Sequence, residues 1–224
     1  MNGNLTEGKI TTGLLKFALP LMAGNVLQQF YNVADTLVLG KFLGPDALAA
    51  AGSSYSLMTF LSSIIIGLCM GSSAYFAMQF GKKDYEKLGN GIFLSFVLIG
   101  ILALVLNICV FLSTGWIIDV LQIPAEIKGM AREYLLYIFA GISAVFIYNF
   151  FACLLRAVGN SFVPLLFLGV SVILNILLDI IFVMLFHWGI KGAAVATVVS
   201  QFVSGTGILV YYYLYFPVLH VTRK

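Results

Sequence analysis

The sequence predicts an all-α membrane protein, a bundle of six transmembrane helices. Three observations predict this fold: the composition, the length of the apolar segments and the division of basic residues between their two ends. Of the 224 residues, 61% are hydrophobic and only 9% are charged, whereas about 25% of the residues in a soluble domain are charged. With so few charged residues, most of the protein surface is expected to face lipid. The lipid bilayer is therefore an expected partner of the chain.

Six apolar segments follow one another along the chain. Each is longer than the roughly 20 residues that a helix needs to cross a bilayer, and none alternates strictly as a membrane strand does. Turn and charge signals such as Gly44-Pro45 and Lys82-Lys83 separate the segments. The predicted spans are residues 14–39, 47–79, 89–113, 130–155, 161–186 and 190–216.

The basic residues indicate the orientation of the bundle. By the predicted spans, 8 of the 12 Lys and Arg residues fall on the side of the amino terminus and 4 on the other side. Because cytoplasmic loops carry an excess of Lys and Arg, both termini are predicted to be cytoplasmic, in a multi-pass protein of the cell membrane. The net charge of +3 is small and its bearers are scattered, which argues against nucleic acid as a partner.

One face of the first span is polar. Its polar side chains recur every three or four residues: Asn25, Gln28, Asn32 and Asp35. On a helix these positions fall within an arc of about 80°. A charged aspartate at the bilayer centre costs about 2.5–3.5 kcal/mol on insertion scales. Asp35 therefore needs a proton, a partner or water, unless it lies near the outer end of its helix and reaches the interface there.

Spans five and six carry polar stripes of their own. Ser171, Asn175 and Asp179 recur every four residues and share one face. Thr197 lies in an oxygen-rich stretch of the sixth span, and the short connection makes the two spans antiparallel neighbours, which brings Thr197 to the layer of Asp179. Alternatively, Asn175 only joins helices by hydrogen bonds while Asp179 remains protonated.

If Asp35 faces this layer, two carboxylates, an amide and a hydroxyl share one site. Such an all-oxygen site suits sodium or a proton and has no soft ligand for zinc or copper. Two carboxylates close together in a low dielectric also raise each other's proton affinity. A site of this kind can exchange a proton or sodium for an organic cation.

Small residues at four-residue spacing predict close helix packing in two spans. They are Gly67 and Gly71 in the second span and Gly192, Ala196, Ser200 and Ser204 in the sixth. Pro20 lies inside the first span, where the loss of a backbone donor favours a bend.

The same segments resemble the amino-terminal lobe of the MATE (multidrug and toxic compound extrusion) family. The resemblance covers essentially the entire chain in order. It is carried by residues 19–44, which include QQFYNVADT, and by LLRAVGN at 154–160, LNILLD at 174–179 and GIKGAAVAT at 189–197.

This resemblance implies secondary antiport, in which inward flow of sodium or protons drives efflux of amphiphilic organic cations by alternating access between two six-helix lobes. The residues that match the family's cation-coupling site are Asp35, Asn175, Asp179 and Thr197. Gln28 and Asn32 would line the substrate cavity, and the first helix would bend at Pro20. The resemblance implies no catalytic residue, and no cofactor or metal beyond the coupling ion.

Family members have about twelve helices, so residues 1–224 would form one lobe of a two-lobe transporter. We therefore expect a second six-helix lobe as a partner. It would belong to a longer chain of which this sequence is a fragment, or it would come from a second half-size protein. A third possibility is a lobe that inserts into the membrane but is inactive by itself.

Other function classes fit the sequence less well. A lipid-linked oligosaccharide flippase of the same superfamily would hold a pyrophosphate with basic residues, whereas the predicted interior carries acids and no clear Lys or Arg. An intramembrane aspartyl protease would place Asp35 and Asp179 in Tyr-Asp and Gly-x-Gly-Asp contexts, which are absent from the sequence. A His-Glu-x-x-His zinc motif is also absent. An enzyme is therefore not expected.

Overall fold

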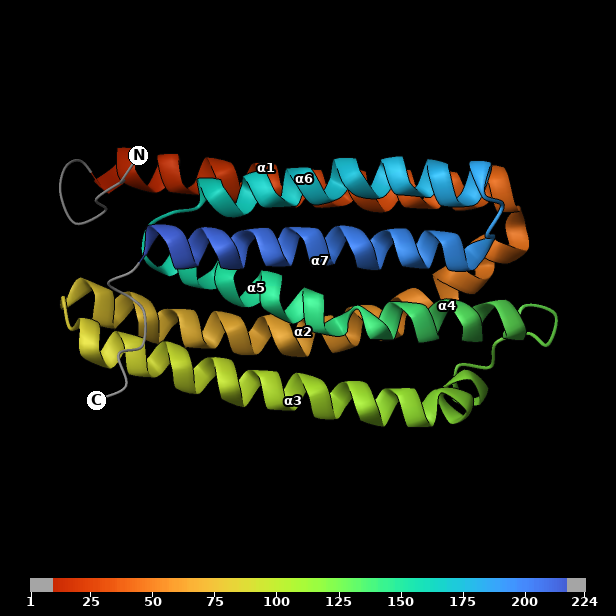
Figure 1. Cartoon of the computed structure of the whole chain (residues 1–224), viewed down its shortest axis with the longest axis horizontal. Helices are drawn as coiled ribbons and strands as arrows, with labels where there is room; N and C mark the ends of the chain where they lie inside the picture. The colour runs from red at the N-terminus through yellow and green to blue at the C-terminus, as the bar shows by residue number, and fades with distance from the viewer. Residues whose placement is uncertain (1–9, 217–224) are drawn as a thin grey trace.

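The computed structural model describes residues 10–216, which form seven α-helices and two short π-helical segments and contain no strand. The predicted all-α bundle is confirmed. Its elements lie nearly parallel to the long axis of the molecule (Figure 1). Their order is α1 (Ile10–Val38), η1 (Leu39–Leu43), α2 (Pro45–Gly81), α3 (Tyr85–Val120), α4 (Lys128–Ala140), α5 (Ile142–Ala157), α6 (Phe162–Asp179), η2 (Ile180–Leu185) and α7 (Ile190–Tyr215).

Most of these elements are long and apolar enough to cross a membrane. Within the described residues, α2, α3, α6 with η2, and α7 meet this criterion, and the pair α4 and α5 adds a fifth span if it is counted as one. The 29 residues of α1 are long enough, but the amide side chains of Asn25, Gln28 and Asn32 lower its mean hydropathy. The sequence predicted six spans. The remaining one would be α1, which does not meet the hydropathy criterion because one of its faces is polar.

The predicted span 130–155 is broken into α4 and α5, which meet at an angle of 44°. Gly141 lies at the break, and a Cβ atom there would come within 2.7 Å of Val198 Cγ2 on α7. The Asn107 side chain of α3 donates a hydrogen bond to the carbonyl oxygen of Phe139, next to the break. Sharp bends in helices commonly occur at glycine, and here the missing side chain also admits α7.

Local chemistry fixes the ends of the long helices. Gly44 has a φ of 86°, which favours glycine, and Pro45 then begins α2 with the fixed φ that suits a first helical turn. At the other end of α2, the Asp84 carboxylate caps α3 by accepting a hydrogen bond from the backbone N–H of Lys87 at 3.1 Å.

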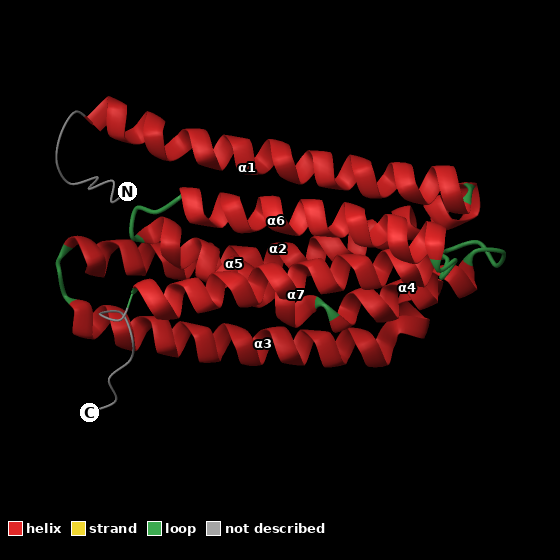
Figure 2. Ribbon diagram, turned by 45° about the horizontal axis from the view of Figure 1, so that its top comes forward, coloured by secondary structure: helices red, strands yellow, loops and turns green. Residues whose placement is uncertain are grey.

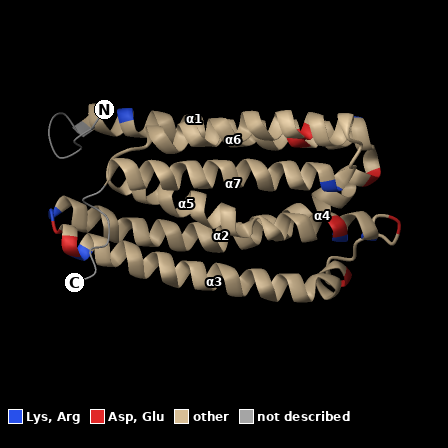
Figure 3. Ribbon diagram, viewed as in Figure 1, with Lys and Arg blue, Asp and Glu red and all other residues tan. Residues whose placement is uncertain are grey.

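The helices pack around α7, which contacts α4, α5 and α6. On one side of this core α2 packs against α3 and α5, and on the other side α1 lies at the edge of the bundle against α6 (Figure 2). The start of α1, the α2–α3 turn and the end of α7 lie at the same end (Figure 1). Charged residues gather at the two ends, and few lie between them (Figure 3).

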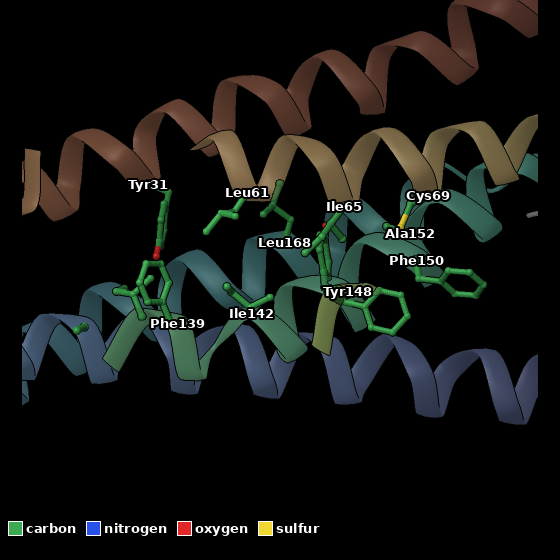
Figure 4. Close-up of a cluster of buried hydrophobic side chains, with 14 of the residues drawn as sticks. Tyr31, Leu61, Ile65, Cys69, Phe139, Ile142, Tyr148, Phe150, Ala152 and Leu168 are labelled. Carbon is green, nitrogen blue, oxygen red and sulfur yellow. The ribbon is translucent and has the colours of Figure 1, made fainter. Parts of the chain in front are cut away.

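Aromatic rings join α2, α3 and α5 into one packed body. The ring centroid of Phe96 on α3 lies 5.2 Å from those of Phe146 and Phe150 on α5. The ring centroid of Phe150 lies 6.0 Å from that of Phe76 on α2. Farther along the same interface, Cys69 of α2 lies beside Ala152 of α5 (Figure 4). Because such contacts are numerous and close, we expect these three helices to move together.

The two stripes of small residues differ in their surroundings. Ala196, Ser200 and Ser204 of α7 are fully buried, which confirms the predicted packing face. Gly67 and Gly71 are exposed, and a Cβ atom at either would meet nothing within 4 Å. The predicted packing of α2 through this pair is therefore wrong within this bundle. The spacing of small residues identifies a face that can pack closely, but it does not say against which partner.

Candidate functional site

A cavity of about 820 Å³ lies between α1, α2, α5, α6 and α7. The polar face of α1 contributes Asn25, Gln28 and Asn32 to its wall, and Pro20 also lines it. The helix α1 continues through Pro20 without interruption. The two residues predicted to line a substrate cavity, Gln28 and Asn32, therefore face this space.

The wall contributed by α2 mixes hydroxyl and apolar side chains. Its lining residues recur at heptad spacing, which places them on one face of the helix. They are Tyr55, Met58, Thr59, Ser62, Ser63, Ile66, Met70, Ser73, Ala74 and Ala77. Such a surface can contact an amphiphilic molecule through apolar atoms and hydroxyl groups at the same time.

The polar stripes of α6 and α7 meet in a buried network. Asn175 and Asp179 of α6 are both 0% exposed. When the Asn175 amide is assigned from its neighbours, its nitrogen donates to Asp179 Oδ2 at 3.2 Å and its oxygen accepts from the backbone N–H of Thr197 at 3.3 Å. The amide also lies 3.4 Å from Thr197 Oγ1. The expected layer of Asp179 and Thr197 is therefore present.

Tyr31 links α1 to this network. Its ring is only 8% exposed, and its hydroxyl donates to Thr197 Oγ1 at 3.2 Å. Figure 4 shows the side chain extending from α1 toward Phe139 at the end of α4. Tyr31 and Thr197 both line the cavity, whereas Asn175 and Asp179 do not. The two hydroxyl groups thus lie at the boundary between the cavity and the buried carboxylate.

Asp35 lies one helical turn beyond Tyr31 and also faces inward. Its Oδ1 is buried without a hydrogen-bond partner, although the residue as a whole is partly exposed. At least one carboxylate oxygen is therefore turned away from the surface. Asp35 lies within electrostatic range of Asp179, Tyr31 and Tyr134. The structure therefore brings the four predicted coupling residues into one region.

Asp179 Oδ1 is likewise buried and has no hydrogen-bond partner. The two ion pairs found among residues 10–216 join Lys87 to Asp84 and Lys128 to Asp119, at the ends of helices. Buried carboxylate oxygens without partners are costly unless a cation, a proton or water satisfies them. The oxygen ligands present fit a hard cation such as sodium, or a proton.

Sequence reasoning missed two residues of this region, Tyr31 and Tyr134, and one residue elsewhere in the cavity wall, Arg156. Tyr31 precedes Asp35 by four residues, so the helical spacing that revealed the polar face could also have revealed it. Tyr134 lies in an apolar segment with no polar stripe, and no pattern in the sequence indicates its position. Arg156 is one of the 8 basic residues that the predicted spans put on the side of the amino terminus, and it lines the cavity. The cavity wall is therefore not free of basic groups.

The fold and the site define a helical membrane protein with a buried acidic site behind the wall of an amphiphilic cavity. The family model MatE matches residues 20–181. The chain therefore belongs to the MATE family, as the resemblance of its motifs indicated.

Curated relatives carry names from multidrug resistance. The chain is 33% identical over 217 residues to the probable multidrug resistance protein YpnP of Bacillus subtilis. This match covers 97% of this chain and 48% of the relative. It is 28% identical over 214 residues to the multidrug export protein MepA of Staphylococcus saprophyticus, covering 92% and 46%. The chain thus spans about half the length of these relatives.

In solved structures, too, this chain matches about half of the longer chain. A crystal structure of MATE in complex with MaL6 superposes with a TM-score of 0.90 at 27% identity, covering 99% of this chain and 49% of that one. The outward-facing conformation of a multidrug resistance MATE transporter gives a TM-score of 0.88 at 28% identity, covering 96% and 47%. One lobe of the known two-lobe fold is therefore present in the described chain.

Proposed function

We propose that this chain forms one lobe of an antiporter that exports amphiphilic organic cations in exchange for sodium or protons. The observation that carries the proposal is the buried network of Asn175, Asp179 and Thr197, which lies directly behind the cavity wall. The names of the relatives, which refer to multidrug resistance and export, support the same function.

The arrangement suggests how the two cations compete. A sodium ion or proton held by Asp35 and Asp179 would neutralise the acidic region, and its departure would restore negative charge behind Tyr31 and Thr197. An organic cation in the cavity would then be attracted toward that charge. Because two positive charges in one low-dielectric region repel each other, occupancy by one favours release of the other.

We also propose that α1 bends at Pro20 when the lobe changes state. The proline removes one backbone hydrogen bond, which lowers the energy needed to bend the helix there. Solved relatives include MATE structures described as bent and as straight. Pro20 lines the cavity, so a bend at this residue would change the shape of the space that the substrate occupies.

Transport in proteoliposomes tests the proposal. Purified protein is reconstituted, a proton or a sodium gradient is imposed, and movement of ethidium is followed by fluorescence. We expect Asp179→Asn to reduce gradient-driven transport by at least tenfold, because an amide cannot hold or release the coupling ion. Glu126→Gln, which neutralises an exposed loop carboxylate, is the matched control and should transport normally. Normal coupling in Asp179→Asn would contradict the proposal.

The half-length match calls for a second arm of the experiment. If the chain alone transports nothing, it is co-reconstituted with the carboxy-terminal half of a full-length relative. Transport restored by the second lobe supports a half-transporter that is inactive by itself. A carboxyl NMR titration in which neither Asp35 nor Asp179 responds to sodium or pH would exclude the cation site itself.

A further inference from the structure

Arg156 is an unpaired cation in the wall of the cavity. It lies in the last turn of α5, at the end of the bundle where α1 begins. Its Nε is buried and has no hydrogen-bond partner, and neither ion pair of the described residues includes it. A guanidinium group stays protonated in proteins, so its charge persists. Arg156 as a whole is partly exposed, so its other donors face the cavity. An anionic group in the cavity could supply the acceptor that the chain does not give to Nε.

Two hydroxyl groups of the cavity wall bond to backbone carbonyls, and neither is a hydrogen-bond partner of Arg156 Nε. The hydroxyl of Tyr148 donates to the carbonyl oxygen of Pro164 at 2.9 Å, and the hydroxyl of Ser161 donates to that of Phe17 at 3.2 Å. These side chains line the same end of the cavity. Among residues 10–216, no side-chain hydrogen bond and no ion pair joins Arg156 to an acid.

The start of α6 adds to the positive potential at this end. Its first residue, Phe162, follows Ser161, which lines the cavity. The amino-terminal end of a helix carries partial positive charge and favours anions. The Val163 N–H at this helix start is already capped by Asn160 Oδ1 at 3.1 Å, so the start of α6 adds a dipole at this end and not a full set of free donors. Tyr31 and Thr197, which border the buried carboxylates, line another part of the cavity.

We propose that Arg156 forms an oxyanion subsite at this mouth of the cavity, for the carboxylate or phosphate group of an amphiphilic molecule. The planar guanidinium matches both groups with paired donors. Two sources supply this chemistry: a zwitterionic solute inside the cavity, or a phospholipid of the adjacent leaflet. The inference rests on the proposed function in one respect, since it takes the cavity to be the solute path.

The subsite gives the cavity two poles. Phe17 and Asn32 of α1 both line the cavity. The helical rise between these two residues, 15 positions at 1.5 Å each, is about 22 Å. A zwitterion would direct its anionic group toward Arg156 and its cationic group toward the amide side chains of α1. The lobe would then favour zwitterions over cations of the same shape.

A matched pair of dyes tests this preference. Rhodamine 110 carries a carboxylate, and rhodamine 123 is its methyl ester. Binding of each dye to the detergent-purified chain is measured by fluorescence polarisation. We expect the native protein to bind rhodamine 110 about tenfold more tightly, and Arg156→Gln to remove the difference by weakening rhodamine 110 binding, while rhodamine 123 affinity does not fall because the variant removes a repelling charge. Lys16→Gln, which removes an exposed charge at the same end, should retain the preference.

The lipid source is tested in parallel by native mass spectrometry with phosphatidylglycerol. Selective loss of this lipid in Arg156→Gln, with the dye ratio unchanged, assigns the subsite to a lipid phosphate. If the native protein shows neither the dye preference nor retained lipid, the inference is overturned whether or not the variant folds. Binding of rhodamine 123 in that case would leave the proposed function intact, whereas failure of both dyes to bind would count against the function as well.

Discussion

The hydroxyl of Thr197 is the point at which three helices meet. It accepts a hydrogen bond from Tyr31 of α1, and it lies within hydrogen-bond distance of the Asn175 amide of α6. Both partners are almost fully buried. A single oxygen on α7 is therefore the hydrogen-bond acceptor of the buried Tyr31 hydroxyl and a close neighbour of the Asn175 amide, and it also borders the cavity.

Replacing Thr197 by valine is expected to lower stability by about 1–3 kcal/mol, because it leaves the buried Tyr31 hydroxyl without its acceptor and places a methyl group beside the Asn175 amide. Thr197→Ser keeps the oxygen and should remain within about 1 kcal/mol of the native protein. Unfolding in detergent, followed by intrinsic fluorescence, measures both. Equal stability of the serine and valine variants would show that the hydroxyl has no such role.

Asp84, in the turn between α2 and α3, is expected to make the stability of the first turn of α3 depend on pH. Its hydrogen bond with the Lys87 side chain, and a second one from the Lys87 backbone N–H, hold the pKa of the carboxyl below its usual value. A carboxyl whose folded pKa is lowered stabilises the folded state above its unfolded pKa of about 3.9. That contribution is lost as the pH falls through the folded pKa.

We therefore expect the first turn of α3 to fray as the pH falls below about 4. Hydrogen exchange of the amides at residues 85–90, measured between pH 6 and pH 3 and corrected for intrinsic rates, reports this opening. Asp84→Asn retains a capping oxygen but does not titrate, so its protection should not depend on pH in this way. The same pH dependence in both proteins would contradict the assignment to Asp84.

At the level of the helix, periodicity predicted the polar elements well and the apolar ones less well. The polar faces of α1 and α6 stand out because their side chains recur at helical spacing within apolar segments. The break at Gly141 and the position of Tyr134 were not predicted, since hydropathy does not distinguish a straight span from a bent one. The π-helical segments η1 and η2, which follow the helices that carry Asp35 and Asp179, also have no sequence signal that we recognised.

Glycine contacts on α7 lead to a prediction about packing. A Cβ atom at Gly205 would lie 3.1 Å from the backbone oxygen of Ala144 on α5. Because a backbone oxygen cannot move aside easily, Gly205→Ala is expected to destabilise the protein by about 1–3 kcal/mol. Gly67→Ala, on an open face of α2, should leave stability unchanged or slightly raise it. Thermal unfolding of the two variants in one detergent compares them directly, and equal midpoints would refute the close contact.

Seen as a whole molecule, the lobe leaves one suitable packing face unused. Gly67 and Gly71 form a G-x-x-x-G pair on α2, and no atom of the described chain lies within 4 Å of the Cβ position at either. In lipid, where apolar side chains gain little by leaving the bilayer, helices associate mainly through such small faces. The chain also spans about half the length of its relatives, and alternating access, which the family resemblance implies, would require a second body. We therefore expect this face to pack against the second lobe.

The double substitution Gly67→Leu with Gly71→Leu tests this arrangement. It should leave the thermal unfolding midpoint of the single lobe nearly unchanged, because the added side chains meet no neighbour in it. It should reduce co-purification with the carboxy-terminal half of a full-length relative by at least tenfold, since the leucines hold the backbones apart. Gly115→Leu, at another open glycine on α3, is the matched control and should leave association intact. Undiminished association of the double variant would show that the second lobe contacts a different face, and a lowered midpoint would show that the glycines are packed within the lobe after all.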